Sequence, residues 1–166
     1  MRYNHNVDTY KTFYLKNKDR LFAYLMRLTG DYPLSSDTMQ ESFTRLLLRY
    51  GPNEQSAALL FKIARNAVMD NVRKTSRYRC AEDEPQDDGM DPEKMVIVRE
   101  TYKKVLKAMQ QLGKTERDIL SLAVSSDLSY RDIADIVGIS EANVRVKIHR
   151  ARMNLKKNLP SGDDDP

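Results

Sequence analysis

Four side chains near the C-terminus have residue types and a spacing suited to contacting base edges in a nucleic acid. They lie on one side of a helix predicted to begin at Ser140, and they are Arg145, Val146, His149 and Arg150. An arginine can form two hydrogen bonds to guanine, and a valine can pack on the methyl group of thymine. Glu141 is the only acidic residue of this helix, whereas a purely solvated face would normally include glutamate and rarely a valine. Lys147, nearer the edge of the face, and Arg152 are better placed for phosphate.

Two helices joined by a short turn must position these side chains. In the first, apolar residues recur at helical offsets, at Tyr130, Ile133, Ala134 and Val137. In the second, they recur at Val144, Ile148, Ala151 and Leu155. Between the helices Gly138 can adopt the left-handed conformation, and Ser129 and Ser140 can cap the two helices. The segment from Ser129 to Leu155 is therefore predicted to be a DNA-binding helix-turn-helix, in preference to a purely structural helical hairpin.

A second basic surface is predicted on a helix that Ser56 caps and that continues towards Arg79. Leu60, Ala64 and Ala67 fall on one side of a helical wheel. The polar and basic residues that fall on the other side or extend it are Lys62, Arg65, Asn66, Arg73, Lys74 and Arg77. Such a face is often only the solvent side of a helix. Here it continues into a basic run with Tyr78 interleaved, which suits phosphate contacts and base stacking.

The other segments with helical periodicity complete the predicted fold. Helices are expected over about 8–29, from a cap at Ser35, Ser36 or Asp37 to about Tyr50, over about 92–111, and over 116–124. Asp91 is expected to cap the helix that begins at Pro92, and Thr115 the helix after it. No run of four or more alternating apolar and polar β-formers stands between turn signals. The predicted fold class is all-α, with two small helical domains.

Charge is distributed unevenly along the chain, whose net charge is +4. Residues 1–80 and 94–160 each hold 14 basic and 7 acidic residues, whereas residues 81–93 hold 7 acidic and no basic ones. We therefore expect domains at 1–80 and 94–166, joined by a flexible acidic linker at 81–93. Two basic blocks favour a polyanionic partner such as DNA. The linker could be a soluble spacer, or it could fold over a basic face and compete with DNA.

Several classes of function find no support in the residues. Cys80 is the only cysteine, and His5 and His149 lie far apart, so we expect no disulfide framework, no metal site and no cofactor. Paired carboxylates in an apolar setting, Gly-rich phosphate loops and nucleophile elbows are missing, so the chain is not expected to be an enzyme. No segment approaches the roughly 18 apolar residues of a membrane span. A cytoplasmic protein without membrane insertion is expected.

The motifs, taken together, resemble the extracytoplasmic-function (ECF) group of bacterial sigma factors over nearly the whole chain. Residues 37–43 (DTMQESF) and 61–70 (FKIARNAVMD), followed by Arg73-Lys74, are similar to runs of the sigma-2 domain. Residues 112–117, 128–134, 139–145 and 149–152 are similar to the sigma-4 domain. Leu59 stands where the family usually has tryptophan, and Ala142-Asn143 replaces a common Gly-Thr pair.

The resemblance implies an RNA polymerase sigma factor that binds core polymerase and directs it to promoter DNA. It implies docking on polymerase through Asp37, Gln40, Glu41, Thr44 and Arg45. It also implies that the basic helix at 57–79 engages the -10 element, that the C-terminal helix reads the -35 element, and that an anti-sigma protein regulates the chain. The alternative is a helix-turn-helix regulator that does not join polymerase, which leaves the helix with Gln40 and Glu41 and the basic helix at 57–79 without a role.

Overall fold

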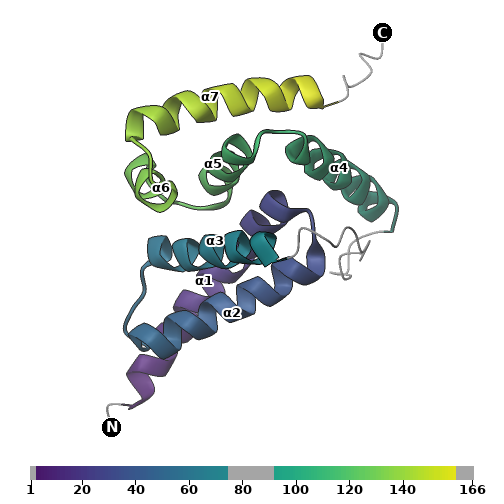
Figure 1. Cartoon of the computed structure of the whole chain (residues 1–166). Coiled ribbons are helices and arrows are strands. Elements are labelled where there is room, and N and C mark those ends of the chain that lie inside the picture. The colour runs from purple at the N-terminus through teal and green to yellow at the C-terminus, as the bar shows by residue number, and fades with distance from the viewer. Residues whose placement is uncertain (1–2, 75–91, 160–166) are drawn as a thin grey trace.

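The computed structural model describes residues 3–74 and 92–159, and the side chains within them except those of residues 3–8, 72–74 and 92–98. Seven helices and no strand occur in this part of the chain, in agreement with the predicted all-α class (Figure 1). They are α1 (Tyr3–Thr29), α2 (Tyr32–Tyr50), α3 (Ala57–Lys74), α4 (Pro92–Gln110), α5 (Lys114–Ser125), α6 (Tyr130–Val137) and α7 (Glu141–Asn158).

The N-terminal half is a three-helix bundle in which α1 and α3 both pack against α2. Its core is rich in aromatic side chains: Phe13 meets Phe43 edge-on with ring centroids 6.2 Å apart, and Tyr24 lies 5.5 Å from Phe61. Tilted and edge-on arrangements place positive ring edges against negative ring faces. Ala64, which is fully buried, has a side chain small enough to let neighbouring helices approach α3 closely.

In the C-terminal half α5, α6 and α7 contact one another, and α4 packs against α7. A small apolar cluster of Met109, Leu112, Leu120 and Ala151 joins α4, α5 and α7. Figure 1 shows α7 along one edge of the molecule, with α5 and α6 between it and the N-terminal bundle.

The two halves share one hydrophobic core. Ile119 and Leu122 of α5 belong to the same buried cluster as Leu21 and Leu25 of α1. Contacts between α1 and α5 are as extensive as those between α1 and α2, and α3 also contacts α6. The structure thus places the two predicted domains directly against each other, a packing that the linear pattern of helices did not specify.

The predicted caps of two helices are wrong. Helix α2 begins at Tyr32 rather than after Ser35, Ser36 or Asp37, because the Asp31 carboxylate accepts a hydrogen bond from the Leu34 N–H at 2.9 Å. Proline is tolerated in the first turn, where its missing N–H has no partner to lose. Helix α5 begins at Lys114 after Gly113, without a side-chain cap, so Thr115 lies inside it.

The predicted helix starts at Ser56 and Pro92 are confirmed, whereas the predicted start of the first helix is not. The Ser56 hydroxyl accepts a hydrogen bond from the Leu59 N–H at 3.1 Å at the start of α3. Helix α4 begins at Pro92 as expected, and it ends at Gln110, one residue before the predicted end. The first helix begins at Tyr3, earlier than the predicted Asp8. The predicted cap Asp91, the end of the third helix near Arg79 and the acidic segment 81–91 lie outside the described residues.

Candidate nucleic-acid interface

The turn between α6 and α7 has the geometry of a helix-turn-helix. Ser129 caps α6 reciprocally with Asp132: its hydroxyl accepts from the Asp132 N–H at 3.1 Å, and the Asp132 carboxylate accepts from the Ser129 N–H at 3.0 Å. Gly138 ends α6 with φ 79° and ψ 38°, a left-handed conformation that costs a glycine little. Ser140 then caps α7 through the Asn143 N–H at 3.2 Å. All three local predictions for this turn are confirmed.

A narrow apolar stripe attaches α7 to the body of the molecule. Val144, Ile148 and Ala151 are buried, and they face α5 and α6. These positions are spaced by four and three residues, which places them on one side of a helix. Because only this stripe is covered, most of the circumference of α7 remains exposed.

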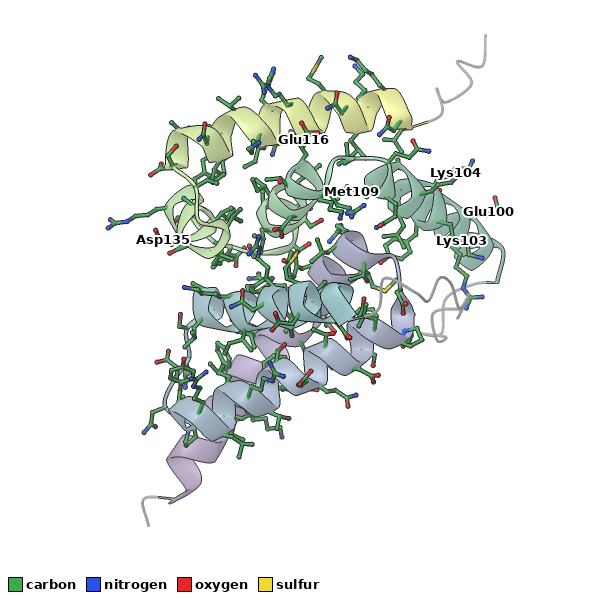
Figure 2. All side chains as sticks on the ribbon, in the orientation of Figure 1. Glu100, Lys103, Lys104, Met109, Glu116 and Asp135 are labelled. Atoms are coloured by element: carbon green, nitrogen blue, oxygen red, sulfur yellow. The ribbon has the colours of Figure 1, made fainter. Side chains whose placement is uncertain are left out.

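The predicted -35 face lies on the free side of α7. Five of its six residues are exposed, namely Arg145, Val146, His149, Arg150 and Arg152. Lys147 is half-buried at the edge, where the sequence placed it. Val146 is 47% exposed although it is apolar. Figure 2 shows a row of side chains projecting from the outer side of α7, away from the other helices.

Arg145 is held in place by two neighbours. Its guanidinium lies 2.8 Å from the Glu141 carboxylate one turn earlier, and 5.2 Å from the centre of the Tyr130 ring. Both contacts restrict a long side chain and so lower the entropy lost when it binds. From the sequence, Glu141 was identified only as the one acidic residue of the helix, and Tyr130 only as an apolar residue of the preceding helix. The spacing of four residues between Glu141 and Arg145 was a usable signal for the ion pair.

The second predicted DNA-contacting face, on α3, is divided by the fold. Lys62 and Asn66 are exposed, as predicted. The Arg65 side chain is only 19% exposed, because its Nε donates to the Asp118 carboxylate of α5 at 2.7 Å. The side chains of Arg73 and Lys74, and the whole of Arg77, lie outside the described residues.

The face of α2 expected to dock on polymerase is open to solvent. All five predicted residues are exposed: Asp37, Gln40, Glu41, Thr44 and Arg45. Glu41 pairs with Arg45, and the Thr44 hydroxyl donates to the Gln40 carbonyl at 2.9 Å. Leu48, which follows Thr44 by four residues, is 81% exposed and extends this face with an apolar group. Leu48 was not among the predicted docking residues, although its spacing places it on the same side as Glu41 and Thr44.

The described residues contain no cluster of three or more potential metal ligands among His, Cys, Asp and Glu. Among the same residues, no helix combines the length and the apolar character needed to cross a bilayer.

Comparison with known proteins assigns both halves of the chain. Residues 13–78 match the family described as Sigma-70 region 2, and residues 102–155 match Sigma-70, region 4. The ECF RNA polymerase sigma factor SigM of Bacillus subtilis is 30% identical over 152 residues, which cover 87% of this chain and 91% of SigM. SigW of the same organism is 27% identical over 157 residues, covering 86% of this chain and 84% of SigW.

Solved structures agree on the fold. The sigma factor RpoE of Bartonella quintana, in complex with the anti-sigma factor NepR, superposes with a TM-score of 0.71 at 22% identity and covers 90% of this chain and 95% of its own. CnrH, in complex with the cytosolic domain of CnrY, superposes with a TM-score of 0.63 at 19% identity, covering 95% of this chain and 89% of its own. With both halves matched in order and a relative aligned over nearly its full length, this chain belongs to the ECF group of RNA polymerase sigma factors.

Proposed function

We propose that this sigma factor joins core RNA polymerase through α2 and reads promoter DNA at two places. Helix α7 contacts the -35 element through its exposed face, and α3 with the residues after it contacts the -10 element. Residues 1–80 and 94–166 are the corresponding domains. The observation that carries the proposal is the division of α7 into a buried apolar stripe and an exposed basic face that includes Val146.

The proposed chemistry is non-covalent. Promoter opening requires that a base leaves the stack, and protein groups that bind the unstacked base offset the few kcal/mol lost in unpairing, about the amount that base-flipping enzymes meet. Lys62 and Asn66 are exposed on α3 and can contact the opened strand. On this proposal the chain acts as an initiation factor in the cytoplasm and catalyses no reaction itself.

An anti-sigma protein is the proposed regulatory partner. RpoE of Bartonella quintana was solved with the anti-sigma factor NepR, and its fold covers nearly all of this chain. A regulator of that kind can act by covering the surfaces that polymerase or DNA would contact. The exposed face of α2, with Leu48 at its end, is one such surface.

Core binding and promoter-specific transcription test the proposal together. The purified chain is expected to form a complex with core polymerase and to support run-off transcription from its own promoters. Arg45→Glu reverses a charge on the exposed face of α2 and is expected to weaken core binding at least about tenfold, as the loss of a charged interface contact commonly does. Lys11→Glu, an equal charge change on an exposed residue of α1, is the matched control. Failure of the unmodified chain to bind core would overturn the proposal.

A further inference from the structure

One buried carboxylate of the C-terminal half accepts hydrogen bonds from two helices of the N-terminal half. Asp118 of α5 is 2% exposed. Its Oδ1 accepts a hydrogen bond from the Tyr24 hydroxyl of α1 at 2.9 Å, and its Oδ2 accepts from Arg65 of α3 at 2.7 Å. Both partners belong to the N-terminal half, so this cluster of Tyr24, Arg65 and Asp118 spans the boundary between the halves.

The polar groups around this cluster are more exposed. Arg27 donates to the Ser125 hydroxyl at 2.7 Å, and Gln110 donates to the Arg27 carbonyl at 3.1 Å. Arg20 pairs with Asp127, whose side chain is 73% exposed. Ion pairs exposed to that degree contribute little to stability. Of the ion pairs described between the two halves, the one at Asp118 is therefore expected to contribute more to holding them together than the exposed pair of Arg20 and Asp127.

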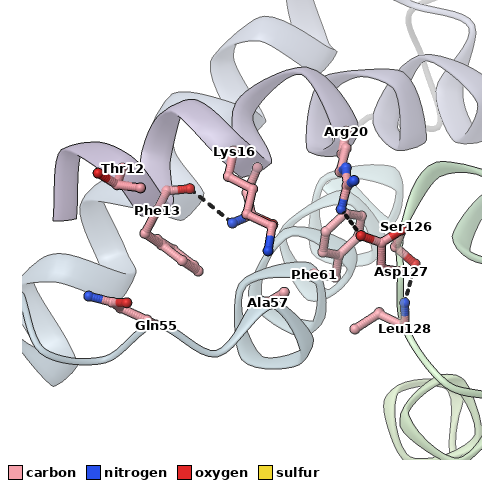
Figure 3. Close-up of a pocket in the computed structure, with 11 residues that line it drawn as sticks. Thr12, Phe13, Lys16, Arg20, Gln55, Ala57, Phe61, Ser126, Asp127 and Leu128 are labelled. Carbon is pink, nitrogen blue, oxygen red and sulfur yellow. Dashed lines mark hydrogen bonds and ion pairs between the residues drawn. The ribbon is translucent and has the colours of Figure 1, made fainter. Parts of the chain in front are cut away.

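The interface is incompletely filled at a second place, whose lining includes none of the three residues of the cluster. A cavity of about 330 Å³ lies between α1, the start of α3 and the segment that joins α5 to α6. Figure 3 shows Phe13, Lys16 and Arg20 on one side of it and Asp127 and Leu128 on the other. Contacts between the halves are missing at this place, so the shared hydrophobic core and the polar cluster hold the halves together elsewhere in the interface.

Arg65 connects this interface to promoter binding. It lies on the face of α3 that we assign to the -10 element, yet in this arrangement its guanidinium is occupied by Asp118. Lys62 and Asn66, on the same face, stay exposed. A buried ion pair gains less than its short distance suggests, because both groups recover their hydration when they separate. Such a contact can hold a closed state that a partner is still able to open.

We propose that Asp118 is a latch: it keeps the two halves closed in the free protein and withholds Arg65 from DNA until polymerase or promoter DNA separates the halves. The claim that Arg65 is withheld from DNA rests on the function proposed above. The claim that Asp118 holds the two halves together does not depend on that function. Tyr24 supports the latch as a hydrogen-bond donor. Burial raises the pKa of its hydroxyl well above the ordinary value, so the proton is retained.

Distance measurements on the full chain without DNA test closure. Spin labels on Asp19→Cys and Asp135→Cys, in a Cys80→Ser background, place one label on α1 and one on α6 at exposed positions. With Asp118 unchanged, the doubly labelled protein is expected to give one narrow distribution of distances between the two labels. Asp118→Asn is expected to shift the ratio of closed to open protein at least about tenfold towards longer distances, and Tyr24→Phe to shift it less. Asp127→Asn, at the exposed pair, is the matched control and is expected to leave the distribution unchanged.

A double-mutant cycle separates the latch from a general loss of stability. If Asp118 and Arg65 act through each other, Asp118→Asn combined with Arg65→Gln opens the protein no more than the stronger single variant does. Circular dichroism verifies that each variant keeps its helices. Additive opening, or a helical Asp118→Asn variant that remains closed, overturns the latch.

Binding of a single-stranded -10 oligonucleotide by the free protein tests the second half of the proposal. Asp118→Asn is expected to bind it several-fold more tightly than the unmodified chain, because Arg65 is released. An opened variant whose affinity does not rise overturns the withholding of Arg65. If the unmodified chain also fails to bind core polymerase, the proposed function has failed as well, while the distance measurements still decide whether Asp118 holds the halves closed.

Discussion

Helices α3 and α7 both carry a predicted DNA-contacting face, but the fold covers them to different degrees. Helix α7 is attached through one stripe and leaves its basic side free. Helix α3 packs against α1 and α2 and also contacts α6, and Arg65 pairs with Asp118 of α5. A helical wheel assumes one packed side and one solvated side. That assumption holds for α7, which lies at the edge of the molecule. It fails for α3, because the second side of this helix faces the C-terminal half.

The largest effect is expected from substitutions on the two sides of α7, which test whether one side is packed and the other free. Ile148→Ala removes a side chain that is 2% exposed and is expected to lower the free energy of unfolding by about 2–5 kcal/mol through a cavity. Val146→Ala, on the exposed side, is expected to change it by no more than about 0.5 kcal/mol. Urea denaturation measures both values. Equal losses would show that α7 is not divided into a buried and a free side.

Base contacts and phosphate contacts on α7 can be separated next. Arg150→Ala is expected to weaken -35 binding by about 1–3 kcal/mol and to relax sequence preference at one position, since a bidentate contact to a base is lost. Arg152→Ala is expected to weaken binding to all sequences about equally. Fluorescence anisotropy with the promoter and a scrambled duplex measures both. A uniform loss for Arg150→Ala would contradict its assignment to a base edge.

The exposed part of α3 is expected to show a smaller effect. Lys62→Ala removes one exposed cation and is expected to weaken binding of the polymerase holoenzyme to promoter DNA by about 1 kcal/mol, with the salt dependence reduced by about one counterion. Lys107→Ala on α4, also exposed, is the matched control. Filter binding over a range of salt concentrations gives both slopes. An unchanged slope for Lys62→Ala would show that Lys62 does not contact the DNA backbone.

The smallest effect is expected at the ion pair that orients Arg145. Glu141→Gln breaks an exposed pair one helical turn apart and is expected to cost no more than about 0.5 kcal/mol of stability. The same change removes a negative charge from a surface that would face phosphates, so binding to -35 DNA is expected to tighten slightly. Thermal denaturation and anisotropy test the two effects. Weaker binding would show that orientation of Arg145 outweighs the repulsion.

The helices and their exposed faces could be predicted from the sequence wherever the interactions that specify them are local. Capping by Ser129 and Ser140, the left-handed turn at Gly138 and the apolar stripe of α7 depend on residues within a few positions of one another. The same holds for the exposed face of α2, whose helix needs only one packed side. The start of α2 was misjudged because several residues could cap it, and the choice of Asp31 depends on where the chain turns after α1.

The contact between the two halves could not be predicted from the sequence, because it depends on residues far apart along the chain. Asp118 follows Arg65 by 53 positions and Tyr24 by 94, and no periodicity in the sequence relates them. A charged residue within a short helix ordinarily indicates a solvated side, and here it became the acceptor at a buried boundary because α1 and α3 bring two donors to it. Arg65 changed from a free cation to a paired one for the same reason. Whether a charged side chain is buried or paired depends on which helices pack against it, and that packing is set by interactions along the whole chain.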